Sequence, residues 1–253
     1  MRYLIRRFLN KMTRGRWVKI RNFISPFVND NVKYYINSEI GQKLYYDGKF
    51  EEKELKLCRQ FIKKDSIVMD IGANIGLHSI YFSKIATHGL ILSIEPQTDV
   101  FQLLLINTSL YKNIIPLNIA IDNDIKISPL FITDDNAYSS LKDTKRKKII
   151  DTKQVVTLPL DNFINLVNKV DFVKIDVEGF EMNVILSMQK ILKTFKPTLF
   201  VEIYKGVNSN MDPEGTIKLL TDIGYKVFVV NNQGSLENFI KHNDSRYNYF
   251  FIA

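Results

Sequence analysis

The segment from Val68 to Gly76 constrains the fold of this chain more than any other part of the sequence. An apolar run leads into D-I-G-A-N-I-G (70–76), and helix-forming residues follow. We interpret this pattern as a buried strand that turns sharply into a helix. Gly72 lets a ligand approach the backbone because it has no Cβ atom, and Gly76 permits close packing of helix on strand. Free N–H groups at the start of the helix would favour an anionic group.

Strands and helices alternate along most of the chain, which indicates an α/β fold with a parallel sheet covered by helices on both faces. Strands are predicted at 66–71, 90–94, 114–121, 170–175, 198–203, 225–230 and 247–252. Helices are predicted at 51–64, 75–87, 98–110 and 213–223, and after Asp161 and Gly179.

The alternation stops between residues 122 and 160. Short β-type pieces at 125–132 and 154–158 flank a polar stretch, in which Lys142–Lys148 carries five basic residues. We predict a solvated loop there, with a phosphate-binding patch as the alternative. The segments 132–152 and 204–212 are expected to face the substrate.

Positive charge is concentrated at the N-terminus. The net charge is +8, and residues 1–21 hold eight basic residues with no acid before Asp30, so the remainder is neutral. Proteins that grip nucleic-acid phosphates usually spread basic residues over the binding face, and we therefore expect no nucleic-acid partner. Arg6 and Arg7 interrupt the first apolar run, which argues against a signal peptide. No window is apolar enough to span a membrane, so we expect a cytoplasmic protein.

Apolar residues of this arm fall near helical spacing. Residues 1–24 are predicted to form a basic amphipathic helix that either packs on the following domain or lies on an anionic membrane surface. Two further alternatives are that this segment is an organelle presequence or that it binds a partner. Tyr45-Tyr46-Asp47-Gly48 is a hairpin-like turn signal, so we divide the chain into an arm with a hairpin-like extension (1–50) and a main domain (51–253).

The single cysteine, Cys58, excludes an internal disulfide and a zinc site made of several cysteines. It lies on the apolar side of a predicted helix, so we interpret it as a buried structural thiol rather than a nucleophile.

An acid follows the glycine turn at the spacing typical of nucleoside binding. The next strand ends in I-E-P (94–96), and Glu95 lies about 20 residues past the glycines, where a carboxylate can accept hydrogen bonds from both ribose hydroxyls. A diphosphate-binding turn would have glycine where this chain has Asp70. A carboxylate there repels a diphosphate and suits a cofactor with an ammonium group. Asp70 therefore favours S-adenosylmethionine over NAD.

A third cluster, K-I-D-V-E-G-F-E (174–181), places three acids at the carboxyl end of a predicted buried strand. With D-I-G-A-N-I-G and I-E-P, this run makes the chain resemble the FkbM family of methyltransferases from about Ser66 to Glu202. The K-I-D-V-E-G run is the specific part, since the glycine turn alone indicates only an S-adenosylmethionine enzyme. Secondary support comes from Asn118-Ile119-Ala120, Tyr138-Ser139-Ser140-Leu141 and Leu160-Asp161.

The resemblance implies a class I methyltransferase fold, a Rossmann-like three-layer sandwich. Its seven-stranded sheet would be mostly parallel, with the last strand inserted antiparallel. The resemblance also implies methyl transfer from S-adenosylmethionine to an oxygen, less often a nitrogen, of a small molecule or sugar, commonly in polysaccharide or natural-product assembly. The expected partner is therefore a small-molecule or glycan acceptor, and residues 51–253 would be the methyltransferase domain.

The resemblance also assigns residues. The turn would line the methionine part of the cofactor, Glu95 would hold the ribose, Asn118 would lie near the adenine, and Asp176 would lie near the transferring methyl group. The full set of expected cofactor-binding residues is Asp70, Gly72, Ala73, Asn74, Gly76, Glu95, Pro96 and Asn118.

A hydroxyl nucleophile needs a base, and the candidates are Asp176, Glu178 and Glu202. Clustered carboxylates raise one another's pKa, which makes a better base near neutral pH. Alternatively, Glu178 and Glu181 only cap or solvate the helix start. We expect no resident metal, although Asp176 and Glu202 would also suit a divalent cation shared with substrate oxygens. His78 is expected to pack or to form a hydrogen bond rather than to catalyse.

Two other functions stay open. A nucleic-acid amino-methyltransferase needs an N/D-P-P-Y/F loop to hold a flipped base, whereas this chain has D-V-E-G there and no Pro-Pro pair. A non-catalytic protein of this fold would bind a partner through the basic arm, but it would not need intact cofactor motifs. The sequence leaves the acceptor and the oligomeric state open.

Overall fold

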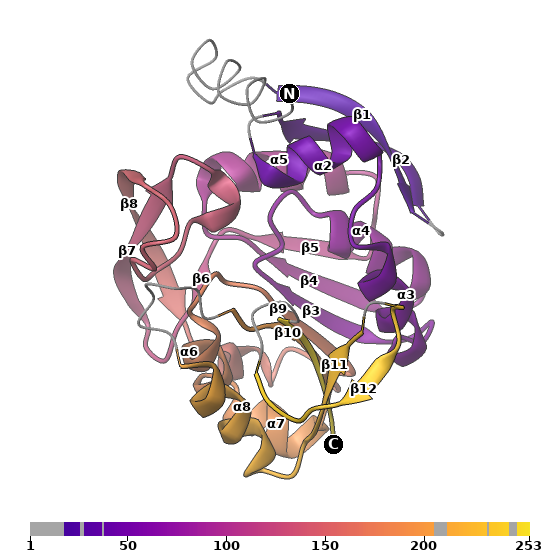
Figure 1. Ribbon diagram of the computed structural model, residues 1–253, viewed down its shortest axis with the longest axis vertical. Coiled ribbons are helices and arrows are strands. Elements are labelled where there is room, and N and C mark those ends of the chain that lie inside the picture. Colours follow the sequence, from indigo (N-terminus) through magenta and orange to yellow (C-terminus); the bar gives the residue numbers. More distant parts are fainter. Residues whose placement is uncertain (1–17, 26–27, 37, 205–211, 232, 243–246) are drawn as a thin grey trace.

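The structure is a computed structural model that describes residues 18–25, 28–36, 38–204, 212–231, 233–242 and 247–253. Its centre is a sheet of eight strands in the order β12-β11-β13-β10-β9-β3-β4-β5 (Figure 1). These strands are β3 (Ile67–Ile71), β4 (Leu90–Ile94), β5 (Ile114–Leu117), β9 (Phe172–Ile175), β10 (Thr198–Glu202), β11 (Lys226–Val230), β12 (Leu236–Asn238) and β13 (Asn248–Ile252). The α/β fold expected from the alternating pattern is confirmed.

The strand directions agree with the sequence, but the strand count does not. The five neighbours from β10 to β5 run parallel, and β13 is inserted antiparallel between β10 and β11. The expected count of seven is wrong because β12 pairs antiparallel with β11 as an eighth strand. Gly234 N–H donates to the carbonyl oxygen of Asn231 and helps to reverse the chain there. Leu236–Asn238 is too short and polar to show alternation.

Helices cover both faces of this sheet (Figure 1). The helices of one face are α3 (Glu52–Phe61), α4 (Leu77–Ile85) and α5 (Thr98–Thr108), and those of the other are α6 (Glu181–Leu186), α7 (Gln189–Phe195) and α8 (Pro213–Thr221). Consecutive strand residues point to opposite faces, so Val68 joins the cluster beneath α3 to α5 and Met69 joins the cluster beneath α6 to α8. The three-layer sandwich is therefore confirmed.

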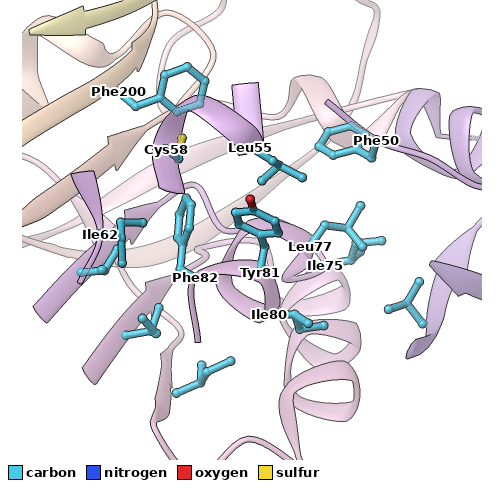
Figure 2. Close-up of a cluster of buried hydrophobic side chains, with 14 of the residues drawn as sticks. Phe50, Leu55, Cys58, Ile62, Ile75, Leu77, Ile80, Tyr81, Phe82 and Phe200 are labelled. Atoms are coloured by element: carbon cyan, nitrogen blue, oxygen red, sulfur yellow. The ribbon is translucent and has the colours of Figure 1, made fainter. Parts of the chain in front are cut away.

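The first of these clusters packs α3 against α4 (Figure 2). Leu55 and Cys58 of α3 lie beside Tyr81 and Phe82 of α4, and Phe200 of β10 belongs to the same cluster. Cys58 is fully buried, and burial raises the pKa of its thiol well above the usual range. A thiol in this setting packs as a small apolar group, as predicted.

The N-terminal part departs from the sequence-based prediction. β1 (Val18–Ser25) and β2 (Val28–Tyr35) form a separate antiparallel hairpin, so the predicted helix is wrong for residues 18–24. Val18, Ile20 and Ile24 are β-branched and occupy alternate positions, which favours a strand. Residues 1–17 lie outside the described part of the chain. In the part that is described, no helix is long and apolar enough to cross a membrane.

The predicted hairpin turn at 45–48 is also wrong, because these residues end a helix, α2 (Glu39–Asp47). Gly48 has φ 66° and donates its N–H to the carbonyl oxygen of Leu44. Helix ends and hairpin turns both favour glycine at positive φ, so the short pattern could not separate them.

Residues 120–158 form a second, three-stranded sheet beside the first. It consists of β6 (Ala120–Ile121), β8 (Ile149–Leu158) and β7 (Lys126–Thr133). The single strand predicted at 114–121 is therefore divided between two sheets. The helix expected from Asp161 is only a short 3-10 turn, η2 (Leu160–Phe163). The Asp161 carboxylate instead accepts the N–H groups of Lys190 and Ile191 and caps α7.

Candidate active site

A cavity of about 300 Å³ opens at the carboxyl ends of β3, β4, β9 and β10. This edge is where open α/β sheets bind ligands. Of the sequence-predicted residues, Gly72, Ala73, Asn74, Glu95, Pro96, Asp176, Glu178 and Glu202 line the cavity. Asp70, Gly76 and Asn118 do not line it.

The glycine turn is held by its neighbours on both sides. The N–H groups of Gly72 and Ala73 both donate to the carbonyl oxygen of Ile94, at 2.9 Å. Gly72 has φ +76°, and a Cβ atom there would lie 1.8 Å from the carbonyl oxygen of Asp176. Only glycine fits this approach of β3 to the end of β9. A Cβ on Gly76 would meet Leu104 at 2.7 Å, so Gly76 permits contact with α5 rather than with a strand.

The N–H groups of the turn before α4 are engaged, whereas the expectation of free N–H groups at the start of the helix stays a prediction. Besides Gly72 and Ala73, Asn74 N–H donates to Glu95 Oε2 at 3.0 Å and Ile75 N–H donates to Asn74 Oδ1 at 2.9 Å. The turn therefore offers no run of free donors to a phosphate.

Asp70 is buried behind the residues that line the cavity. Its carboxylate is fully buried, accepts a 2.5 Å hydrogen bond from Ser79 Oγ, and lies 3.5 Å from Lys174 Nζ. Lys174 Nζ also lies 3.1 Å from Asp176 Oδ2 and donates to the carbonyl oxygen of Gly72 at 2.8 Å. Burial alone would lower the pKa of Lys174, but Asp176 and Asp70 outweigh burial and raise it. Lys174 thus stays charged and joins the glycine turn to the end of β9.

Glu95 is held rigidly at the end of β4. The side chain is 7% exposed, and its two oxygens accept the N–H groups of Asn74 and Gln97. Burial raises the pKa of this carboxyl to about 7. Asn118 Nδ2 donates to the carbonyl oxygens of Glu95 and Pro96, at 2.9 and 3.1 Å, so Asn118 braces the Glu95 loop.

Gln97 is a cavity residue that the sequence prediction did not include. The residue is 7% exposed, and its Oε1 atom is buried without a hydrogen-bond partner among the described residues. A buried acceptor of this kind is costly unless a ligand or water satisfies it.

The three predicted base candidates do come together. Asp176, Glu178 and Glu202 each place a carboxylate oxygen within 4.8 Å of the others, a spacing that would also suit a shared divalent cation. Burial, and then the charge of Asp176, raises the pKa of both Glu178 and Glu202 well above the usual range. Glu181 lies apart at the start of α6, where its carboxylate accepts the N–H of Gly179.

The three carboxylates differ in their partners. Asp176 is paired with Lys174, and Glu178 is paired with Arg146. Glu202 has no hydrogen bond or ion pair with any residue that the structure describes. The cluster therefore holds two neutralised carboxylates and one that lacks a cation.

Arg146 was missed because the basic run 142–148 was predicted to be solvated. The Arg146 side chain is only 17% exposed and reaches the cavity. Its guanidinium carbon lies 4.6 Å from the ring centroid of Tyr138 and 4.3 Å from that of Tyr204. Of the two interpretations of residues 142–148, the solvated loop does not account for a cavity-lining arginine. The phosphate-binding patch does require a basic residue that faces a ligand site.

The segment before the main domain also supplies cavity residues. Lys43 of α2 lines the cavity, although residues 1–50 were assigned to an extension, and Glu51, the first residue of the main domain, lines it as well. Glu51 has a positive φ of 44°, and its carboxylate lies 3.2 Å from Nε2 of His78. The His78 ring packs against Phe50. These contacts agree with a packing histidine whose Nε2 atom lies beside a carboxylate.

The fold and this edge of the sheet define the class of protein. A Rossmann-like sandwich with the last strand antiparallel, a buried glycine turn and a carboxylate at the end of β4 is the architecture of class I methyltransferases. The methyltransferase FkbM domain matches residues 70–227, which is more than half of the chain, and the protein belongs to this family. Membership agrees with S-adenosylmethionine, the cofactor expected from the sequence.

Two known proteins illustrate the relationship. Hexuronic acid methyltransferase AglP of Haloferax volcanii is 28% identical over 182 residues, which cover 70% of each chain. The crystal structure of methyltransferase FkbM from Methylobacillus flagellatus KT aligns with a TM-score of 0.51 and 16% identity. This alignment covers 75% of the present chain and 44% of the other, and at this identity it shows the shared fold alone.

Proposed function

We propose that this protein transfers a methyl group from S-adenosylmethionine to a hydroxyl group of a sugar in a glycan. The observation that carries the proposal is the carboxylate cluster beside the glycine turn, in which Glu202 lacks a cation partner. The relative AglP, named as a hexuronic acid methyltransferase, supports a sugar acceptor.

The lining of the cavity fits the proposed cofactor. Glu95 would accept the ribose hydroxyls, and the buried Gln97 Oε1 would accept the adenine amino group. The engaged N–H groups of the turn suit a cofactor without phosphate, and the acidic lining suits one with a sulfonium and an ammonium group. When bound, S-adenosylmethionine supplies an electrophilic methyl group that passes to a nucleophile in one displacement.

The side chains of this protein would prepare the acceptor. Glu202 would take the proton of the acceptor hydroxyl, because burial and the neighbouring Asp176 raise the pKa of its carboxyl above the usual range and so make it a stronger base. Lys174 and Arg146 would keep Asp176 and Glu178 neutralised. Since two of the three negative charges are already balanced, a metal ion is not required to hold the cluster together.

Methyl transfer from labelled S-adenosylmethionine to uronic-acid and neutral glycans tests the proposal. The product should be an ether that survives mild alkali, because a hydroxyl is the proposed nucleophile. A product released by alkali would instead be a methyl ester and would place the methyl group on a carboxylate. A labelled amine would contradict the oxygen assignment.

The Glu202→Gln variant tests the proposed base. We expect kcat to fall by about a hundredfold or more, with an unchanged Kd for S-adenosylhomocysteine. Glu181→Gln is the matched control, since this acid lies outside the cavity and should retain transfer. Unchanged kcat in Glu202→Gln would move the base elsewhere. Cofactor binding without transfer to any acceptor would favour the non-catalytic, partner-binding alternative.

A further inference from the structure

The guanidinium group of Arg146 has binding capacity that the rest of the structure does not use. Its two neighbouring tyrosines come from different parts of the fold, Tyr138 from η1 (Asn136–Tyr138) and Tyr204 from the segment after β10. Within the described residues, only Nη1 is hydrogen-bonded, to Glu178. An arginine side chain has five N–H donors, so most of them stay available at the cavity.

The geometry of the guanidinium N–H donors favours a carboxylate as the ligand. A planar guanidinium binds carboxylates through two parallel hydrogen bonds, which a lysine ammonium cannot reproduce. Aromatic rings beside the guanidinium restrict its orientation and reduce the entropy lost on binding. Arg146 is thus preorganised to receive a carboxylate.

The other cations of the cavity are less suitable. The Lys174 side chain is 3% exposed and is committed to Asp70 and Asp176. Lys43 Nζ lies 3.2 Å from Glu39, and a lysine provides a point charge rather than a fork. Because the cavity is lined by more acids than bases, an acidic acceptor needs one cation that engages it directly.

We propose that Arg146 is the acceptor-recognition residue and that it binds the carboxylate of an acidic sugar such as a hexuronic acid. This inference rests on the proposed sugar methylation and adds the acceptor class. Arg146 contacts Glu178, whose carboxylate lies within 4.8 Å of Glu202. A sugar held at Arg146 by its carboxylate therefore has its ring hydroxyls beside the proposed base.

A pair of matched acceptors tests the inference by binding, without the transfer reaction. The full-length protein with S-adenosylhomocysteine is titrated with p-nitrophenyl glucuronide and with p-nitrophenyl glucoside. The two probes differ in having a carboxylate or a hydroxymethyl group on the ring. We expect the glucuronide to bind about ten- to hundredfold more tightly, the range given by a hydrogen-bonded charged group. Equal affinities, or no binding of the glucuronide, would overturn the inference.

Three variants assign this preference to one residue. Arg146→Gln should remove the preference for the glucuronide, so that the two probes bind this variant with equal affinity. Arg146→Lys should restore only part of the preference, because it keeps the charge and loses the fork. Lys145→Gln is the control, since Lys145 is 67% exposed and pairs with Asp143.

The outcomes separate this inference from the proposed function. Loss of preference in Lys43→Gln instead of Arg146→Gln would move the carboxylate site to α2 and refute the assignment. Methyl transfer to neutral and acidic sugars alike would keep the proposed function and refute the inference. Selective binding of the glucuronide without transfer to any sugar would support the inference and refute the proposed chemistry.

Discussion

Replacing Gly72 by alanine should destabilise the protein by an amount that can be worked out from two features of the turn. The left-handed conformation at φ +76° costs an L residue about 1–2 kcal/mol. The new Cβ would also lie 1.8 Å from the carbonyl oxygen of Asp176. A backbone atom cannot rotate away, so the ends of β3 and β9 must separate, which costs about 1–3 kcal/mol more. The expected loss in free energy of unfolding is therefore about 2–5 kcal/mol.

Gly224→Ala provides the matched control for this measurement. Gly224 also has a positive φ, +100°, but a Cβ atom there would meet nothing within 4 Å. This variant should lose only the conformational part, about 1–2 kcal/mol. Urea denaturation of both variants, with equal m-values, gives the difference that belongs to the close approach. Equal losses in the two variants would refute the idea that β9 crowds the turn.

Three further predictions concern charge and the N-terminus. Burial raises the pKa of Glu95 to about 7. Below this pH the carboxyl group of the free protein holds a proton, which must be released when the ribose binds. The affinity for S-adenosylhomocysteine should therefore fall as the pH drops, by up to about tenfold per pH unit. Calorimetric titrations should find this dependence absent in Glu95→Gln, and parallel profiles would remove Glu95 from the ribose site. Lys174→Met leaves Asp70 and Asp176 without their shared cation. Urea denaturation should show a loss of about 3–5 kcal/mol in the free energy of unfolding. A loss below about 1 kcal/mol would show that another group compensates the two negative charges. If the arm lies on a membrane surface, deleting residues 1–17, which precede β1, should leave cofactor affinity and Tm unchanged and reduce sedimentation with anionic vesicles. Equal sedimentation would contradict this alternative, and a lower Tm would favour an arm that packs on the domain.

The sequence predicted those parts of the site that depend on local pattern. The glycine turn, Glu95 and the acidic run each follow a strand of the parallel sheet, and the carboxyl ends of such strands share one edge. Asp176 and Glu202 end up close because β9 and β10 are neighbours in that sheet. The alternation of apolar strands with helices was sufficient to predict that these residues share one edge of the sheet.

The sequence could not predict residue positions that depend on contacts between distant segments. Arg146 belongs to a polar run whose charge suggested solvent, but the rings of Tyr138 and Tyr204 and the carboxylate of Glu178 hold it at the cavity. Asp161 has the sequence features of a helix start, yet it caps α7 at a separation of about 30 residues. Asn118 hydrogen-bonds the backbone after β4, and its expected position near the adenine stays a prediction. No periodicity in the sequence reports such pairings.

The contacts of the β7–β8 hairpin (126–158) have a consequence for its local stability. None of its residues belongs to either of the two large hydrophobic clusters, and polar contacts link it to the cavity wall. These contacts are Tyr138 to Glu39, Arg146 to Glu178 and Ser140 to Val177. Such contacts exchange readily with water, so this hairpin should have a lower free energy of local unfolding than the central sheet. Its amide protons should therefore exchange with solvent earlier than those of the central sheet.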